Sequence, residues 1–159
     1  MRTYLIPMLA ALLYFQGCGK EPAGNETPEA AADPSGLSAD ELEHGIGPIK
    51  SDVALGPLDA TLAASGQGVF EMKCLSCHKL GERFIGPDLT GVLDRRTPRY
   101  VLNMILNPEE MVQRHPEAKK LLAEYLAPMA QQNLTHDEAR AVLEYIRSAP
   151  ATGTVAVAE

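Results

Sequence analysis

The chain has 159 residues, enough for one domain with a hydrophobic core and additional terminal segments. Its formal net charge of −7 excludes nucleic acid as an expected partner, because nucleic-acid-binding domains carry a basic surface. Aromatic residues make up only 5% of the chain and tryptophan is absent, so we expect a bound apolar group to complete the core.

Residues 1–17 are expected to be an export signal. Arg2 precedes a mostly apolar run at 5–15 that is too short to span a bilayer. The run ends at Gly17-Cys18, a small residue before a lone cysteine, which resembles the lipidation site of bacterial lipoproteins. In this interpretation Cys18 carries a lipid that anchors the exported protein to the extracytoplasmic side of the cell membrane. A simply cleaved signal peptide and an uncleaved anchor are the alternatives.

Residues 18–44 are expected to form an acidic, flexible linker between this lipid anchor and a folded domain at 45–150. Between residues 20 and 44, seven carboxylates accompany a single lysine, and large apolar side chains are scarce. Most of the negative charge therefore belongs to the linker, and the folded domain is near neutral. Residues 151–159 are expected to be a frayed tail.

The pattern after the linker predicts an all-α domain of about four to five helices, with a short extended N-terminal extension. Pieces broken by Gly and Pro at 45–57 predict extended segments, with a small hairpin as an alternative. Asp59 is the expected N-cap of the first helix, and Thr135 begins a capping box for the last. The helical segments are expected at 59–73, 97–106, 108–114, 117–126 and 135–148.

The stretch Cys74-Leu75-Ser76-Cys77-His78 directly follows the first of these helices. Two cysteines separated by two residues, with a histidine next, form the attachment signature of a c-type haem. One turn of chain lets both thiols reach the vinyl groups of the porphyrin, and His78 can then bind the iron. A thioredoxin-like redox pair would need a βαβ context, which the pattern does not contain.

Gly66, Phe70 and Tyr145 stand at positions typical of the first and last helices of one family. The sequence resembles the class I (mitochondrial-type) monohaem c-type cytochromes over residues 59–148, in a bacterial lipoprotein form. This resemblance implies a cytochrome c fold around one covalently bound haem c. It also implies that the carbonyl of Pro87, in the Gly86-Pro87-Asp88-Leu89 loop, accepts the N–H of the haem-ligating histidine.

The resemblance further implies Met129 as the second iron ligand, because the family places its axial methionine in the loop before the last helix. A His/Met pair is common in electron-carrying cytochromes. Met104 lies on a helix stripe typical of core packing, whereas Met111 is a rival loop ligand. The histidine alternatives are His44, His115 and His136.

Arg95 and Arg96 follow the Gly-Pro loop where the family places an arginine near a haem propionate, and Tyr100 is a candidate hydroxyl donor to the same carboxylate. A solvated basic loop is the alternative for the arginines. Basic residues near the motif predict either a rim that steers docking to an acidic partner or a scattered solvated surface. These residues are Lys73, Lys79, Arg83, Arg95, Arg96 and Arg99.

Three functional hypotheses follow. The first is a monomeric, non-enzymatic monohaem electron carrier between a membrane donor complex and a terminal reductase or oxidase. The segment 105–111 resembles, more weakly, cytochromes that accompany nitrous-oxide reductase systems or terminal oxidases. The second is a haem-based enzyme or gas sensor with a labile sixth ligand. The third is a non-haem redox or metal module that uses Cys74 and Cys77.

Overall fold

The computed structural model describes residues 34–149. Within this part the fold is all-α, as the sequence predicts, with six α-helices, one 3-10 helix and no strand. The expected signal, Cys18, most of the expected linker and the expected tail lie outside the described residues. The elements are α1 (Ala39–His44), α2 (Ala60–Lys73), η1 (Val92–Asp94), α3 (Pro98–Leu106), α4 (Pro108–Arg114), α5 (Pro116–Tyr125) and α6 (His136–Ser148).

Side chains at the helix termini set the boundaries that the sequence predicts. The Asp59 carboxylate accepts hydrogen bonds from two backbone N–H groups in the first turn of α2. Thr97 caps α3 in the same way, with Pro98 at the first helical position. Thr135 and Glu138 form the expected capping box of α6. Local chemistry therefore defines most of the helix pattern.

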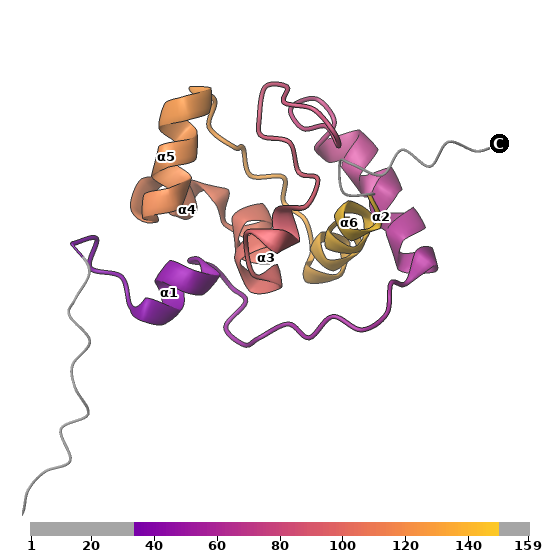
Figure 1. The fold of residues 1–159 in the computed structure, drawn as a ribbon, viewed down its shortest axis with the longest axis horizontal. Coiled ribbons are helices and arrows are strands. Elements are labelled where there is room, and N and C mark those ends of the chain that lie inside the picture. Colours follow the sequence, from indigo (N-terminus) through magenta and orange to yellow (C-terminus); the bar gives the residue numbers. More distant parts are fainter. Residues whose placement is uncertain (1–33, 150–159) are drawn as a thin grey trace, which may run out of the picture.

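Helices α2 and α6 cross in close contact because Gly66 has no side chain (Figure 1). A Cβ atom at Gly66 would stand 1.9 Å from the backbone oxygen of Ala141. One turn further along, the rings of Phe70 and Tyr145 pack at 5.3 Å between centroids. The backbone of α6 therefore lies on the glycine, and Tyr145 contacts Phe70 beside it.

Two groups of buried side chains form the core. The larger joins α2, α3 and α6, and consists of Phe70, Val101, Leu102, Ile105, Leu106, Ala139, Val142, Leu143 and Ile146. The smaller lies on the other side of α3, and consists of Leu37, Ile46, Tyr100, Met111 and Ala118. Helix α3 therefore separates the main core from a second core that the N-terminal segment helps to build.

The end of the predicted linker is ordered, so the expectation of flexibility up to residue 44 is wrong. A capping box of Ser38 and Glu41 begins α1, and Leu37 is only 4% exposed. Arg99 donates to both carboxylate oxygens of Asp40, at 2.8 and 2.6 Å. The acids that gave this segment its linker composition serve here as a helix cap and an ion-pair partner. We call residues 37–49 the N-terminal strap.

The hairpin considered for 45–57 is also absent, since the described residues contain no strand. This segment continues from α1 to α2 as coil along one side of the molecule (Figure 1). Within residues 34–149, no helix combines the length and the apolar character that crossing a membrane requires.

Glu144 fastens α6 to the beginning of α2. Its carboxylate is 0% exposed and accepts from the backbone N–H of Asp59 at 2.9 Å. Arg140 and Arg147 donate to the same carboxylate at 2.5 and 2.8 Å. Burial raises the pKa of Glu144, but these three donors outweigh it and hold the pKa below the ordinary value of 4.5.

The close approach at Gly66 predicts opposite effects for two alanine substitutions in α2. Gly66→Ala forces the backbones of α2 and α6 apart and should lower the free energy of unfolding by roughly 3 kcal/mol. Gly68→Ala meets no atom within 4 Å and should raise it by about 0.5–1 kcal/mol, because alanine favours the helix. Denaturant unfolding of the haem-loaded protein measures both. Equal stabilities of the two variants would contradict the contact.

The buried carboxylate predicts a loss of stability in acid. Because the folded-state pKa of Glu144 is depressed, its contribution is present above pH 4.5 and is lost as the pH falls through the folded-state pKa. Glu144→Gln should therefore flatten the acid side of a stability–pH profile measured by denaturant unfolding. Glu109→Gln, an exposed position on α4, is the control. An unchanged acid limb in Glu144→Gln would refute this role.

Candidate haem-binding site

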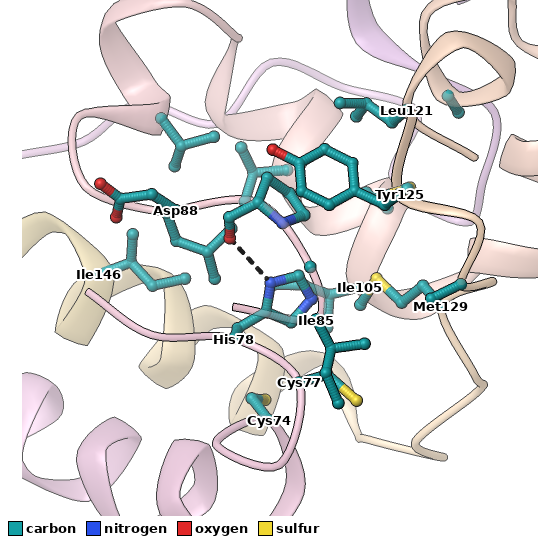
Figure 2. A pocket seen from close by; sticks show the side chains of 18 of the residues that line it. Cys74, Cys77, His78, Ile85, Asp88, Ile105, Leu121, Tyr125, Met129 and Ile146 are labelled. Carbon is teal, nitrogen blue, oxygen red and sulfur yellow. Dashed lines mark hydrogen bonds between the residues drawn. The ribbon is translucent and has the colours of Figure 1, made fainter. Parts of the chain in front are cut away.

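A cavity of about 470 Å³ lies between the Cys74–His78 stretch, α3, α5 and the loop before α6 (Figure 2). This volume is typical of sites for small molecules and cofactors, and most of the lining side chains are apolar. Cys18 lies outside the described residues. All the other predicted site residues line the cavity, namely Cys74, Cys77, His78, Pro87, Arg95, Tyr100 and Met129.

The two cysteines stand on a single turn at the end of α2. The backbone N–H groups of Cys77 and His78 both donate to the carbonyl of Cys74, at 3.0 and 2.8 Å. Both thiols are free, with Cys74 half-buried and Cys77 exposed. Burial, with a smaller contribution from Cys77, raises the pKa of the Cys74 thiol to about 11. The turn thus presents two free thiols beside one histidine.

The imidazole of His78 is oriented by the Gly-Pro loop. Its Nδ1 lies 3.2 Å from the carbonyl oxygen of Pro87, the contact that Figure 2 shows as a dashed line. When Nδ1–H donates to this carbonyl, Nε2 keeps its lone pair free for a metal. Burial lowers the pKa of His78, partly opposed by the Pro87 hydrogen bond, so the ring is held neutral. A neutral, oriented imidazole is the form that binds iron.

Two residues of the same loop allow this contact, and sequence analysis missed the role of one. A Cβ at Gly86 would stand 2.6 Å from Cε1 of His78, so only glycine lets the loop lie on the ring. Asp88 accepts from the backbone N–H groups of Gly81 and Thr90, both at 2.9 Å, and closes the loop. An aspartate directly after Gly-Pro is a turn signal that would have indicated this role.

Met129 enters the cavity from the loop between α5 and α6. In Figure 2 its sulfur and the His78 ring point into the same space. Gln131 anchors this loop by donating to the carbonyl of Leu106 at 3.0 Å. Met104 of α3 also lines the cavity, whereas Met111 does not, and its sulfur accepts the N–H of Ile46 at 3.1 Å. Met111, the rival candidate for the second iron ligand, lies in α4 and its sulfur is engaged by this hydrogen bond.

The alternative histidines lie away from the cavity. His115 is 1% exposed, with its ring nitrogens beside the carbonyl of Leu42 and the N–H of Glu117. His44 contacts the hydroxyl of Thr97 at 3.1 Å, and His136 is exposed at the beginning of α6. None of the three lines the cavity.

The match to known proteins agrees with this geometry. A family model described as cytochrome c matches residues 63–150, more than half of the chain. This chain belongs to the cytochrome c family. A search of curated proteins gave no match.

Solved structures are similar over the same region. Cytochrome c from Rhodothermus marinus is 47% identical, with a TM-score of 0.64 over 69% of this chain and 95% of the other. An engineered form from that organism is 47% identical, with a TM-score of 0.63 over 68% and 94%. A second engineered form, bound to a carbene intermediate, is 48% identical, with a TM-score of 0.61 over 68% and 94%. The chain is thus an electron-carrying class I c-type cytochrome, a family that binds haem c covalently.

Tyr100 also lines the cavity of this cytochrome. Tyr100 is 4% exposed, and its buried hydroxyl has no hydrogen-bond partner among the described residues. Because the hydroxyl oxygen has almost no accessible surface, the structure does not place it at the open face of the cavity, and a role toward a haem carboxylate stays a prediction. Burial raises the pKa of Tyr100 and keeps the hydroxyl protonated as a donor. Two free thiols on one turn, an oriented imidazole and a thioether line one apolar cavity, and the residues present therefore fit haem c.

Arg95, the other predicted propionate partner, is bonded to backbone in this structure. Its guanidinium donates to the carbonyls of Thr90 and Asp88, at 3.2 and 3.5 Å. Arg95 therefore supports the loop that orients His78 while it lines the cavity. A role toward a propionate remains a proposal for this side chain.

The basic rim considered from the sequence is largely neutralised within the chain. Lys79 pairs with Glu82 and Arg83 with Glu124, both at 2.7 Å. Arg96 likewise pairs with Glu117, and Arg99 with Asp40. The exposed pairs of Lys79 and Arg83 contribute little to stability, but all four pairs leave less uncompensated charge to attract an acidic partner.

The contact of Gly86 with His78 predicts a defect in haem binding when a methyl group is added. Gly86→Ala should displace the imidazole and lower the yield of covalently attached haem several-fold. Gly56→Ala, which meets no atom within 4 Å, is the matched control. The ratio of haem absorbance to protein after acid–acetone extraction measures the yield. A wild-type ratio and an unchanged ferric spectrum in Gly86→Ala would contradict the account.

Proposed function

We propose that this cytochrome is a monohaem electron carrier in which His78 and Met129 are the two iron ligands. The main support for this proposal is that both side chains point into one cavity, beside the two free thiols of Cys74 and Cys77. Two protein ligands would complete the iron coordination and leave no position for a substrate. Bound haem c would supply one-electron exchange between ferric and ferrous iron.

Each protein group has a distinct task in this proposal. Cys74 and Cys77 attach the group covalently, and Pro87 keeps the His78 ring in orientation and tautomer. The apolar walls of α3, α5 and α6 exclude water, which favours the less charged ferrous state. A thioether ligand from Met129 acts in the same direction, since His/Met coordination raises the potential.

We further propose that the protein works as a monomer on the extracytoplasmic side of the cell membrane. The sequence supports this location through the export signal and through Cys18 as a lipid attachment point. A tether of this kind raises the effective concentration of the carrier near a membrane donor complex and a terminal reductase or oxidase. Because the folded domain is near neutral, its recognition of these partners depends on shape and apolar contact as much as on charge.

Two methionine substitutions test the ligand assignment. Met129→Leu keeps the volume but removes the thioether, so we expect a high-spin ferric spectrum, a lower potential and rapid binding of added azide. Met104→Leu alters the other methionine of the cavity and should leave the low-spin spectrum unchanged. Optical and electron paramagnetic resonance spectra of the matured proteins measure both.

Two results would count against the electron-carrier proposal. A high-spin wild-type protein that binds azide as fast as Met129→Leu would favour a haem enzyme or gas sensor with a labile sixth position. Loss of the low-spin spectrum in Met104→Leu, but not in Met129→Leu, would assign the ligand to α3 instead.

A further inference from the structure

The last turn of α5, which leads into the Met129 loop, buries little surface against the described chain. In α5 only Ala118, in the first turn, is buried. Among the described helices, only α4 packs extensively on α5. At the other end of α5, Glu124 is exposed, and Leu126, directly after the helix, is 83% exposed. The end of α5 therefore depends on other contacts to hold its place.

Arg83, in the loop after His78, supplies these contacts. Its guanidinium donates to the carboxylate of Glu124 at 2.7 Å and to the backbone oxygen of the same residue at 3.5 Å. The guanidinium also lies over the ring of Tyr125, 4.1 Å from the ring centroid. Within residues 34–149, no other hydrogen bond, ion pair or cation–π contact joins this turn to a distant part of the chain. We call the contacts of Arg83 with Glu124 and Tyr125 the Arg83 clasp.

The loop that carries Arg83 is itself fastened to the cysteine turn. The backbone N–H of Gly86 donates to the carbonyl of Cys77 at 2.7 Å. The N–H of Gly81 donates to the carboxylate of Asp88 at 2.9 Å. Arg83 stands between these two anchored points. The clasp therefore joins the turn that presents the two thiols to the helix that precedes Met129.

The Met129 loop has the backbone of a segment that can move as a unit. Residues 127–132 contain no helix, and a residue in the left-handed region stands at each end. These residues are Leu126 and Asn133, with φ of 55° and 52°. Side chains rarely adopt this region, so surrounding contacts must hold the two residues in it. Gln131 provides one such contact, to Leu106, and the clasp holds the turn before Leu126.

We propose that the Arg83 clasp keeps Met129 on the iron and thereby closes the sixth position to small external ligands. Arg83 is then a positioning residue that acts through α5. This inference rests on the proposed function, in which Met129 is an iron ligand. Tyr125 lies four residues before Met129, and Figure 2 shows both entering the cavity from the same side. A contact that holds the turn of Tyr125 therefore limits how far Met129 can move.

The modest strength of an exposed ion pair suits this role. Arg83 and Glu124 have side chains that are 56% and 53% exposed, so their pairing adds little to the stability of the whole domain. Opening of a single loop, however, requires much less free energy than global unfolding. A weak contact at the base of the loop can therefore set the population of the open form. Small ligands reach the iron only in that form.

The chain offers a matched control for substitutions of Arg83. Arg83→Leu removes both the ion pair and the contact with the Tyr125 ring. Arg83→Lys keeps the charge but loses the planar group that stacks on the ring. Arg114→Leu removes the same charge from an arginine of similar exposure, 47%, whose ion pair with Glu110 lies within α4. Arg114 does not line the cavity.

The experiment measures the rate at which imidazole binds to the ferric, haem-loaded protein in stopped flow. Above its own pKa imidazole is neutral, so the charge of a variant does not steer it. We expect Arg83→Leu to bind imidazole roughly threefold faster than the wild type. Arg83→Lys should be intermediate, and Arg114→Leu should match the wild type. Glu124→Gln should accelerate binding in the wild type but not in Arg83→Leu.

Amide hydrogen exchange distinguishes a clasp from a general stabiliser. In Arg83→Leu, exchange should become faster in residues 122–133 and stay unchanged in α2 and α6. Added salt should accelerate imidazole binding more in the wild type than in Arg83→Leu, because salt screens the exposed ion pair.

The outcomes separate this inference from the proposed function. A high-spin spectrum in the wild type would overturn the assignment of Met129 as ligand. With a low-spin wild type, equal imidazole rates in Arg83→Leu and Arg114→Leu would overturn the inference alone. Faster binding in Arg83→Leu that is accompanied by faster exchange in α2 and α6 would also overturn it, because the loss would then be one of global stability.

Discussion

The structure depends on an apolar cavity that the chain does not fill with its own side chains. Helices α2, α3 and α6 pack on one another, yet about 470 Å³ remains between them and the Cys74–His78 stretch. A domain with so few aromatic residues gains the missing apolar contacts when a large flat group occupies this space. The helices and the proposed cofactor are therefore parts of one core. The close crossing at Gly66 sets the distance between α2 and α6.

The sequence predicted the features that local chemistry determines. Helix boundaries follow from caps such as Thr97 and Thr135, and the cysteine turn follows from the spacing of its residues. The family resemblance predicted the contact of His78 with Pro87, and the structure contains it. These residues are only nine apart, so one local loop brings them together. The placement of Met129 in the same cavity required the resemblance, because sequence spacing alone does not bring it to His78.

The strap could not be predicted, because its contacts join residues far apart in sequence. Asn103 reaches back to His44 and Ile49, and His115 reaches back to Leu42 across 73 residues. The acidic composition predicted a flexible linker, because a single buried apolar residue, Leu37, gives little signal among so many charged residues. Buried polar side chains such as Asn103 and His115 follow no periodic pattern in the sequence. Their partners are visible only when the fold is known.

The central claim is that one nitrogen from His78 and one sulfur from Met129 hold the iron. X-ray absorption at the iron edge of the matured protein tests it most directly, because sulfur and nitrogen scatter differently at bonding distance. The account predicts a six-coordinate iron with one sulfur neighbour in the wild type, which is lost in Met129→Leu and kept in Met104→Leu. A wild-type spectrum with no sulfur neighbour, or one that Met129→Leu leaves unchanged, would contradict the account.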